Sequence, residues 1–208
     1  MKLQISFDMT DLDQALSIAQ KVHPYCDQFE VGSPLLYQLG VKAVEAFRKN
    51  FPDKTIVTDT KIIDRGEEIV KIMSKAGTDW VTVMGGTNKD VLYTVARAAE
   101  RYKVKVMVDL IDATAPGQTA MEAQGFGGDA ILMHKPHDEG DSLSFLDQWD
   151  LVRGNSKLPV FISAKIDRSN VGKVIDLKPD GIIIGQSITD ADNPEQEAKH
   201  FYKLCKKT

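Results

Sequence analysis

Eight short apolar runs recur along the chain, and a longer amphipathic stretch follows each of them. The runs are rich in Val, Ile and Phe and start at intervals of roughly 20 to 30 residues. They cover residues 3–7, 28–31, 55–58, 80–83, 105–108, 130–133, 159–162 and 181–184. Short strand-like runs that alternate with helical segments are typical of repeated βα units with parallel strands, and not of hairpins.

The segments between the runs have helical periodicity. Apolar residues fall on one helical face over residues 12–22 and again over residues 91–99. A series of right-handed βα crossovers in 208 residues closes most economically as a parallel (β/α)8 barrel of the TIM type, and an open doubly wound sheet is the alternative. Because no linker, low-complexity tract or charge block divides the chain, we expect a single barrel domain over residues 1–208.

The charge balance argues against two classes of partner. With 26 basic and 30 acidic residues the formal net charge is -4, whereas nucleic acid and anionic membranes select for clustered Lys and Arg. Cys26 and Cys205 lack the spacing of a zinc site or a disulfide framework. The N-terminus is too polar after Phe7 for a signal peptide, and no apolar run has membrane-spanning length. We therefore expect a cytoplasmic protein that binds neither nucleic acid nor membranes.

Polar residues follow nearly every apolar run, at the positions where strands would end. In parallel barrels the chemistry lies in the loops at the carboxyl ends of the strands, so these residues are the candidates for a functional site. They are Asp8, Glu30, Asp59 with Lys61 and Asp64, Asp109, His134, Ser163 with Lys165, and Gly185 with Gln186.

The pattern Asp59-x-Lys61-x-x-Asp64 carries the strongest chemical signal. Two carboxylates beside one ammonium keep the lysine protonated and leave a carboxylate to serve a cation or a proton, although a solvated ion-pair cluster would have the same sequence. Glu30 ends the preceding strand and faces the same barrel mouth, so Glu30 and Asp59 can share a hard divalent cation such as Mg²⁺. The alternative for Glu30 is a buried carboxylate that Lys61 neutralises.

Four segments resemble one known enzyme family. They are 29–35 (FEVGSPL), 59–64 (DTKIID), 106–111 (VMVDLI) and 184–189 (IGQSIT). They resemble 3-hexulose-6-phosphate synthase and its relative 3-keto-L-gulonate-6-phosphate decarboxylase, of the orotidine-phosphate-decarboxylase suprafamily. The likeness runs from Leu3 to about Ala198 and keeps the order of the motifs.

This resemblance implies a magnesium-dependent carbon-carbon lyase that acts on a sugar phosphate through an enediolate. It implies that Glu30 and Asp59 ligate Mg²⁺, that Asp8 binds substrate hydroxyls, that Lys61 and Asp64 steady the developing anion, that His134 shuttles protons, and that Asp109 belongs to the catalytic set. It also implies a homodimer with active sites at the interface, where Asp64 reaches the neighbouring site.

The chain departs from the family where phosphate is held. The Gly-Gly pair expected after the seventh strand is replaced by Ala164 and Lys165, next to Ser163. We expect the Lys165 ammonium to replace a lost amide contact, with Gly185 and Gln186 supplying the other half of the grip; the alternative is that Lys165 obstructs the site.

The family resemblance leaves three functions open. Asp109 and the segment 51–54 (FPDK) resemble the synthase, which joins formaldehyde to ribulose 5-phosphate, whereas the decarboxylase usually has glutamate at the position of Asp109. Positions His137 and Ser163 are intermediate, so decarboxylation of 3-keto-L-gulonate 6-phosphate is the alternative. A barrel that binds a sugar phosphate without catalysis is the third, motivated by Ala164 and Lys165.

Overall fold

The strands close on themselves into one parallel barrel. The structure, a computed structural model, describes residues 1–138, 140 and 143–207. The strands are β1 (Lys2–Phe7), β2 (Gln28–Val31), β3 (Thr55–Ile62), β4 (Trp80–Met84), β5 (Lys105–Asp109), β6 (Ala130–His134), β7 (Val160–Ser163) and β8 (Gly181–Ile184). Each strand pairs in parallel with the next, and β1 pairs with β8, so the (β/α)8 barrel is confirmed and the open sheet is ruled out.

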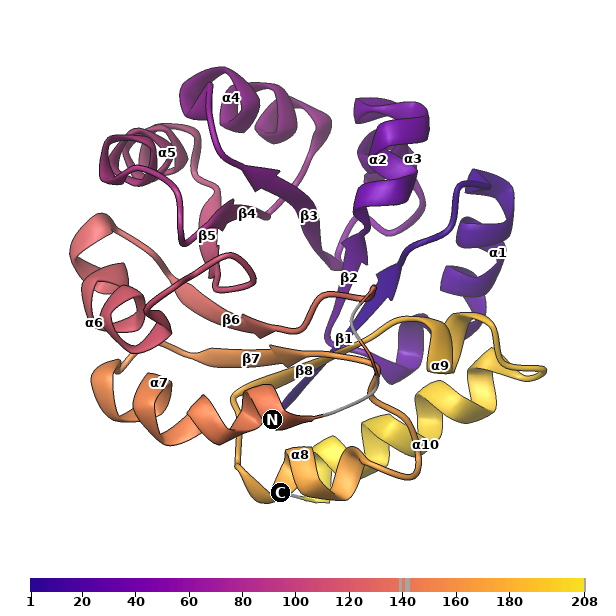
Figure 1. Ribbon diagram of the computed structural model, residues 1–208. Helices are drawn as coiled ribbons and strands as arrows, with labels where there is room; N and C mark the ends of the chain where they lie inside the picture. The colour runs from indigo at the N-terminus through magenta and orange to yellow at the C-terminus, as the bar shows by residue number, and fades with distance from the viewer. Residues whose placement is uncertain (139, 141–142, 208) are drawn as a thin grey trace.

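Helices surround the barrel on its outside (Figure 1). They are α1 (Leu12–Val22), α2 (Ser33–Leu39), α3 (Val41–Asn50), α4 (Gly66–Ala76), α5 (Lys89–Tyr102), α6 (Pro116–Phe126), α7 (Trp149–Asn155), α8 (Val171–Asp176), α9 (Gln186–Thr189) and α10 (Pro194–Lys207), with 3-10 turns η1 (His23–Tyr25) and η2 (Ser144–Gln148). Within the described ranges, we find no helix with the length and apolar character needed to cross a membrane.

Both faces of the barrel wall are buried, which explains why the strands are nearly continuous apolar runs. Phe29 of β2 packs against the rings of Phe7, Phe47 and Phe51, with centroids 5.0 to 5.9 Å from its own, in the layer between barrel and helices. The barrel interior holds a second apolar cluster of Val57, Trp80, Met107, Ala130, Leu132, Phe161 and Ile183. Because side chains alternate along a strand, Glu30 points to the interior when Phe29 points outward.

β3 extends four residues beyond the apolar run that predicts it. Thr58 pairs with Val81 of β4, and the next pair is Ile62 with Val83. Because β3 advances four residues while β4 advances two, β3 bulges between these two pairs. Within the bulge Lys61 has a left-handed backbone, with φ 44°. The bulge therefore re-aims the chain at the point where Asp59 and Lys61 occur.

Aspartates brace the opposite, amino-terminal end of the barrel. One such residue directly precedes each even-numbered strand, and its carboxylate accepts the backbone N–H of a residue at the start of the preceding strand, at 2.7 to 2.8 Å. The pairs are Asp27 with Leu3, Asp79 with Ile56, Asp129 with Val106, and Asp180 with Val160. Each aspartate N–H also donates to the carbonyl of the same residue. These reciprocal pairs support the fold, and the carboxyl-terminal end is left for the functional loops.

Candidate active site

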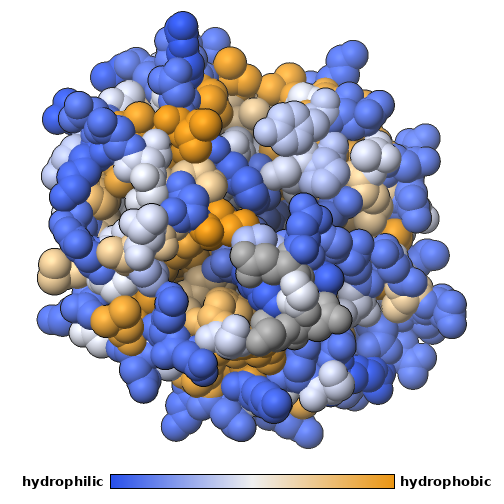
Figure 2. Space-filling view, in the orientation of Figure 1, coloured by the Kyte–Doolittle hydropathy of each residue, from blue (hydrophilic) through white to orange (hydrophobic). Residues whose placement is uncertain are grey.

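A cavity of about 580 Å³ opens at the carboxyl ends of the strands. Nine of the predicted site residues line it: Asp8, Glu30, Asp59, Lys61, His134, Ser163, Lys165, Gly185 and Gln186. In Figure 2 hydrophilic residues cover most of the periphery of one face, and hydrophobic residues appear nearer its middle. Glu30, Asp59 and Lys61 therefore share one cavity, as the sequence predicts for a joint cation and substrate site.

Asp59 and Lys61 form a hydrogen-bonded ion pair at the bulge of β3. The Asp59 carboxylate also accepts from Ser33 Oγ, 2.7 Å from Oδ2, and from Thr82 Oγ1, 2.9 Å from Oδ1. Burial raises the pKa of Asp59, but the Lys61 charge and the hydrogen bonds from Lys61 and Ser33 outweigh it and leave this pKa below its ordinary value. Burial lowers the pKa of Lys61, but Asp59 and Asp109 outweigh it and leave that pKa raised. Both groups are therefore charged at neutral pH.

Glu30 has the opposite character. Its carboxyl group is buried, and Gln4 Nε2 donates to Oε2 at 2.5 Å, while Gln28 donates in turn to Gln4. Burial raises the pKa of Glu30 well above its ordinary value, and repulsion from Asp59 and Asp8 adds to the effect. The folded structure therefore disfavours the ionised form of Glu30, and a bound cation would offset that cost.

Asp8 follows β1 and packs closely over two glycines. A Cβ at Gly32 would lie 2.2 Å from Asp8 Oδ1, and one at Gly185 would lie 3.1 Å from Oδ2. The pKa of Asp8 is raised above its ordinary value, mainly by burial. A hydrogen bond with Ser6 opposes this rise, and the charge of Asp59 adds to it. Glycine at these two positions makes the room that brings Asp8 into the cavity.

His134 ends β6 and is held by Asp109. His134 Nδ1 lies 2.8 Å from Asp109 Oδ2, and the same oxygen lies 4.0 Å from Lys61 Nζ. Asp109 is completely buried and does not line the cavity, so it acts on the site through its two neighbours. An ionised Asp109 accepts the Nδ1–H, which leaves Nε2 of a neutral His134 with its lone pair available.

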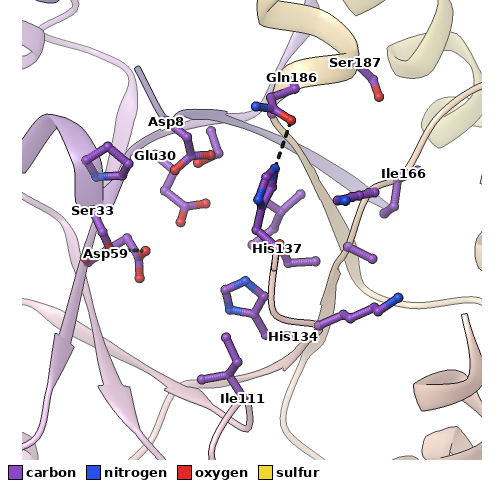
Figure 3. Close-up of a pocket in the computed structure, with 18 of the residues that line it drawn as sticks. Asp8, Glu30, Ser33, Asp59, Ile111, His134, His137, Ile166, Gln186 and Ser187 are labelled. Atoms are coloured by element: carbon purple, nitrogen blue, oxygen red, sulfur yellow. Dashed lines mark hydrogen bonds between the residues drawn. The ribbon is translucent and has the colours of Figure 1, made fainter. Parts of the chain in front are cut away.

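The carboxyl groups lie on the β1–β3 side of the cavity, with the histidines across from them. Figure 3 shows Asp8, Glu30 and Asp59 on one side and His134 and His137 facing them. This arrangement places two imidazole groups opposite a cluster of carboxyl groups.

The loops after β6, β7 and β8 form the remaining wall. His137 Nε2 lies 3.1 Å from Gln186 Oε1, a contact drawn in Figure 3 that joins the loops after β6 and β8. The carbonyl of Lys165 accepts from Asn170 Nδ2 at 2.8 Å. Lys135 is buried in the cavity wall, and its ammonium donates to the carbonyl of Gly140. Among the described residues that line this wall, Lys135 and Lys165 outnumber the one carboxylate, that of Asp167, so this wall is the more positive side of the cavity.

Asp64 is, besides Asp109, the other predicted site residue that does not line the cavity of its own chain. It is exposed, it follows the bulge, and it does not line the cavity. The adjacent Ile63 is 62% exposed. The role of Asp64 across a subunit interface stays a prediction.

Ser33, Lys135 and Thr82 contact or line the site, although none of them has a role predicted from sequence. Ser33 lies inside the segment FEVGSPL and could have been found there, since it directly follows a strand-end glycine. Lys135 is adjacent to His134 and resembles an ordinary solvated loop lysine in sequence. Thr82 lies in the middle of an apolar strand, where sequence offers no signal of its contact with Asp59.

The oxygen donors fit a hard divalent cation bound by few protein ligands. Among the residues that the structure describes, no three His, Cys, Asp or Glu side chains gather in a metal-binding group. Mg²⁺ commonly takes only one or two carboxylates and completes its shell with water and substrate oxygens. Glu30 and Asp59 would supply those two carboxylates, and the buried, mutually repelling carboxyl groups around Glu30 are the feature that a cation would relieve.

Comparison with known proteins agrees with this geometry. Residues 1–201 match the Orotidine 5'-phosphate decarboxylase / HUMPS family. The chain is 28% identical to a 3-hexulose-6-phosphate synthase of Bacillus subtilis, with 98% of each chain covered. It is 30% identical to one of Mycobacterium gastri, covering 97% of this chain and 98% of the relative.

Solved structures of a 3-hexulose-6-phosphate synthase and of a 3-keto-L-gulonate-6-phosphate decarboxylase (KGPDC) superpose on the barrel. A 3-hexulose-6-phosphate synthase from Salmonella typhimurium has a TM-score of 0.92 at 28% identity, covering 100% of this chain and 99% of the other. A KGPDC from Streptococcus mutans, solved as a complex with a ligand, has a TM-score of 0.90 at 26% identity, covering 99% and 97%. The family model matches residues 1–201, and the barrel and its cavity agree with that match. The chain therefore belongs to the Orotidine 5'-phosphate decarboxylase / HUMPS family.

Proposed function

We propose that the protein is a 3-hexulose-6-phosphate synthase, a lyase that joins formaldehyde to ribulose 5-phosphate or reverses that step. The observation that carries the proposal is the charged pair of Asp59 and Lys61, which shares a cavity with Glu30 and His134. Relatives with this name cover nearly the whole chain, which supports the same assignment.

Lys61 provides a fixed positive charge for the reaction. Removal of the C1 proton of ribulose 5-phosphate leaves an enediolate whose negative charge lies mainly on the C2 oxygen, beside the C1 hydroxyl. The Lys61 ammonium, held by Asp59, stabilises this anion more than it stabilises the neutral ketone, so it lowers the barrier. A divalent cation held by Glu30 and Asp59 would supply Lewis-acid stabilisation of the same oxygens.

His134 is suited to carry the proton. Nε2 of the neutral imidazole accepts the C1 proton, while Asp109 holds Nδ1 and stabilises the imidazolium that forms. C1 then attacks the carbon of formaldehyde, and the proton passes from Nε2 to the formaldehyde oxygen, which becomes a hydroxyl group. Asp8 lines the same cavity, and we expect it to accept hydrogen bonds from the substrate hydroxyls.

We assign the phosphate group to the wall formed by the loops after β7 and β8. Ser163, Lys165, Gly185 and Gln186 all line this part of the cavity. The Lys165 ammonium lies where the family pattern has glycine, and a fixed side-chain charge can replace backbone amides in holding a phosphate dianion.

The function is tested by assays of the purified chain with both candidate substrates. We expect formaldehyde-dependent consumption of ribulose 5-phosphate with Mg²⁺ and its loss after treatment with EDTA, restored by added Mg²⁺. Carbon dioxide release from 3-keto-L-gulonate 6-phosphate as the faster reaction would instead establish the decarboxylase, which the similarity to the Streptococcus mutans structure supports. Tight binding of ribulose 5-phosphate without turnover of either substrate would establish a binding protein.

We also propose a homodimer in which Asp64 completes the site of the partner subunit. Its exposure beside an exposed isoleucine, outside the cavity of its own chain, supports this placement. Inactive Lys61→Ala and Asp64→Ala proteins, mixed and allowed to exchange subunits, should recover about a quarter of the wild-type activity, because half of the dimers then contain one intact site. No recovery in a mixture shown to have exchanged would rule out the shared site. The expected cytoplasmic location stays a prediction.

A further inference from the structure

Thr82 contacts both members of the Asp59–Lys61 pair from the neighbouring strand. Its side chain is buried in β4 and is 1% exposed. Thr82 Oγ1 donates to Asp59 Oδ1 at 2.9 Å and accepts the backbone N–H of Lys61 at 2.9 Å. The Thr82 carbonyl accepts from Thr60 Oγ1 at 2.8 Å, so three successive residues of β3 are tied to this one residue.

The contact with Lys61 occurs where the backbone is least favourable. Lys61 has φ 44°, in the left-handed region that non-glycine residues seldom adopt, and it lies in the bulge where β3 loses its regular register with β4. A regular strand would bond the Lys61 N–H to a backbone carbonyl of its neighbour. Here a side-chain hydroxyl accepts that N–H, which satisfies a group that the bulge removes from the normal ladder.

The contact with Asp59 restricts how that carboxylate can turn. Oδ2 accepts from Ser33 and Lys61, and Oδ1 accepts from Thr82. With both oxygens bonded from different elements, rotation of the carboxylate would break at least one hydrogen bond. A buried acceptor that loses its donor is costly, so the orientation is well defined.

We propose that Thr82 is a positioning residue that sets the geometry of the Asp59 carboxylate and the Lys61 ammonium together. One hydroxyl has two simultaneous bonds, so a shift in either partner is passed to the other. The proposal rests on the proposed function for its kinetic consequence, but its structural content concerns the bulge alone.

The decisive variant is Thr82→Val, which keeps the shape of the side chain and removes the hydroxyl. We expect kcat to fall on the order of 10-fold, with KM for ribulose 5-phosphate changed by less than about 3-fold, because Thr82 does not line the cavity. Thr82→Ser keeps the hydroxyl and should retain most of the wild-type kcat.

Thr58→Val is the matched control. Thr58 is equally buried, and its hydroxyl lies 2.7 Å from that of Thr78, away from the cavity lining. This variant should lose stability without a comparable loss of kcat. The proposal would be overturned by an unchanged kcat in Thr82→Val. It would also be overturned if Thr58→Val or Thr82→Ser lost as much kcat as Thr82→Val.

Amide exchange separates the positioning role from the proposed function. In Thr82→Val the Lys61 amide should exchange with solvent faster, relative to the amides of the other strands, because its acceptor is gone. If the wild-type protein proves inactive on both substrates, the proposed function fails, and this measurement alone decides the role of Thr82. Unchanged protection of the Lys61 amide would overturn it.

Discussion

Replacement of Lys61 by methionine isolates its charge. Methionine has a similar length and no charge, so the cavity keeps much of its shape. In the variant, Asp59 is still buried and still accepts hydrogen bonds from Ser33 and Thr82. Asp109 keeps its contact with His134. Loss of one charged group that stabilises a transition-state oxyanion typically costs 100- to 1000-fold, so we expect kcat to fall by about that factor.

The same variant should lose stability in a pH-dependent way. Breaking a fully buried ion pair costs about 3–5 kcal/mol, but the Lys61 side chain is 30% exposed and Asp59 keeps two hydrogen bonds, so we expect on the order of 2 kcal/mol. For a chain of this size that lowers Tm by about 4–8 °C.

The pH dependence follows from the direction of the Asp59 pKa shift. In the wild-type protein this pKa is lowered, so Asp59 contributes stability that is present above its ordinary value of 3.8 and is lost as the pH falls through the folded value. In the variant, burial is the largest remaining cause and raises the pKa of Asp59, so ionisation of this carboxyl group destabilises the fold as the pH rises above its ordinary value. The stability difference between the two proteins should therefore grow as the pH rises above about 4.

A double variant provides the control. Asp59→Asn in the Lys61→Met background removes the uncompensated buried charge, so Tm should recover by most of the loss while kcat stays low. Thermal unfolding between pH 4.5 and 8 and initial-rate kinetics measure both effects. A single variant that keeps wild-type kcat, or a double variant no more stable than the single one, would refute the account of the pair.

Three further predictions concern other parts of the molecule. The pKa of Glu30 is raised, so without metal the ionisation of Glu30 destabilises the fold as the pH rises above about 4.5. Glu30→Gln should therefore be more stable than the wild type at pH 8 in EDTA. Mg²⁺ should raise the Tm of the wild type but not that of the variant. Lys165→Gly should raise the Kd for ribulose 5-phosphate about 10-fold in calorimetry if the lysine grips phosphate, and tighter binding would show that it obstructs. Asp129→Ala should lower the free energy of unfolding by about 1 kcal/mol in urea without changing kcat, because it removes only the bond to the Val106 N–H.

Most of the fold was accessible from sequence because barrel strands are buried on both faces. Continuous apolar runs mark such strands directly, and the observed bounds of β2 (Gln28–Val31) and β8 (Gly181–Ile184) match the predicted runs. β3 (Thr55–Ile62) departs furthest from its predicted run, since three of the four residues in its second half are polar. The polar half is a strand only because β4 pairs with it beyond the bulge, and the local sequence does not contain that information.

Strand-end residues were predictable for the same reason. In a parallel barrel all carboxyl ends meet at one mouth, so Glu30, Asp59 and His134 had to approach one another once the fold was known. The aspartates before the even-numbered strands were also visible in sequence, but their reciprocal bonds to the preceding strands were not.

The sequence by itself determined the topology and the identity of most residues in the cavity, because burial patterns and strand order are encoded locally along the chain. Tertiary structure decided the electrical state and the geometry of those residues. Asp59 and Glu30 are both strand-end carboxylates, yet contact with Lys61 lowers the pKa of Asp59 while burial beside other carboxyls raises that of Glu30. Likewise, Thr82 supports the site only because the bulge of β3 brings Lys61 to its hydroxyl. Such effects depend on distances between strands and on the exclusion of water, and these exist only when the barrel is closed.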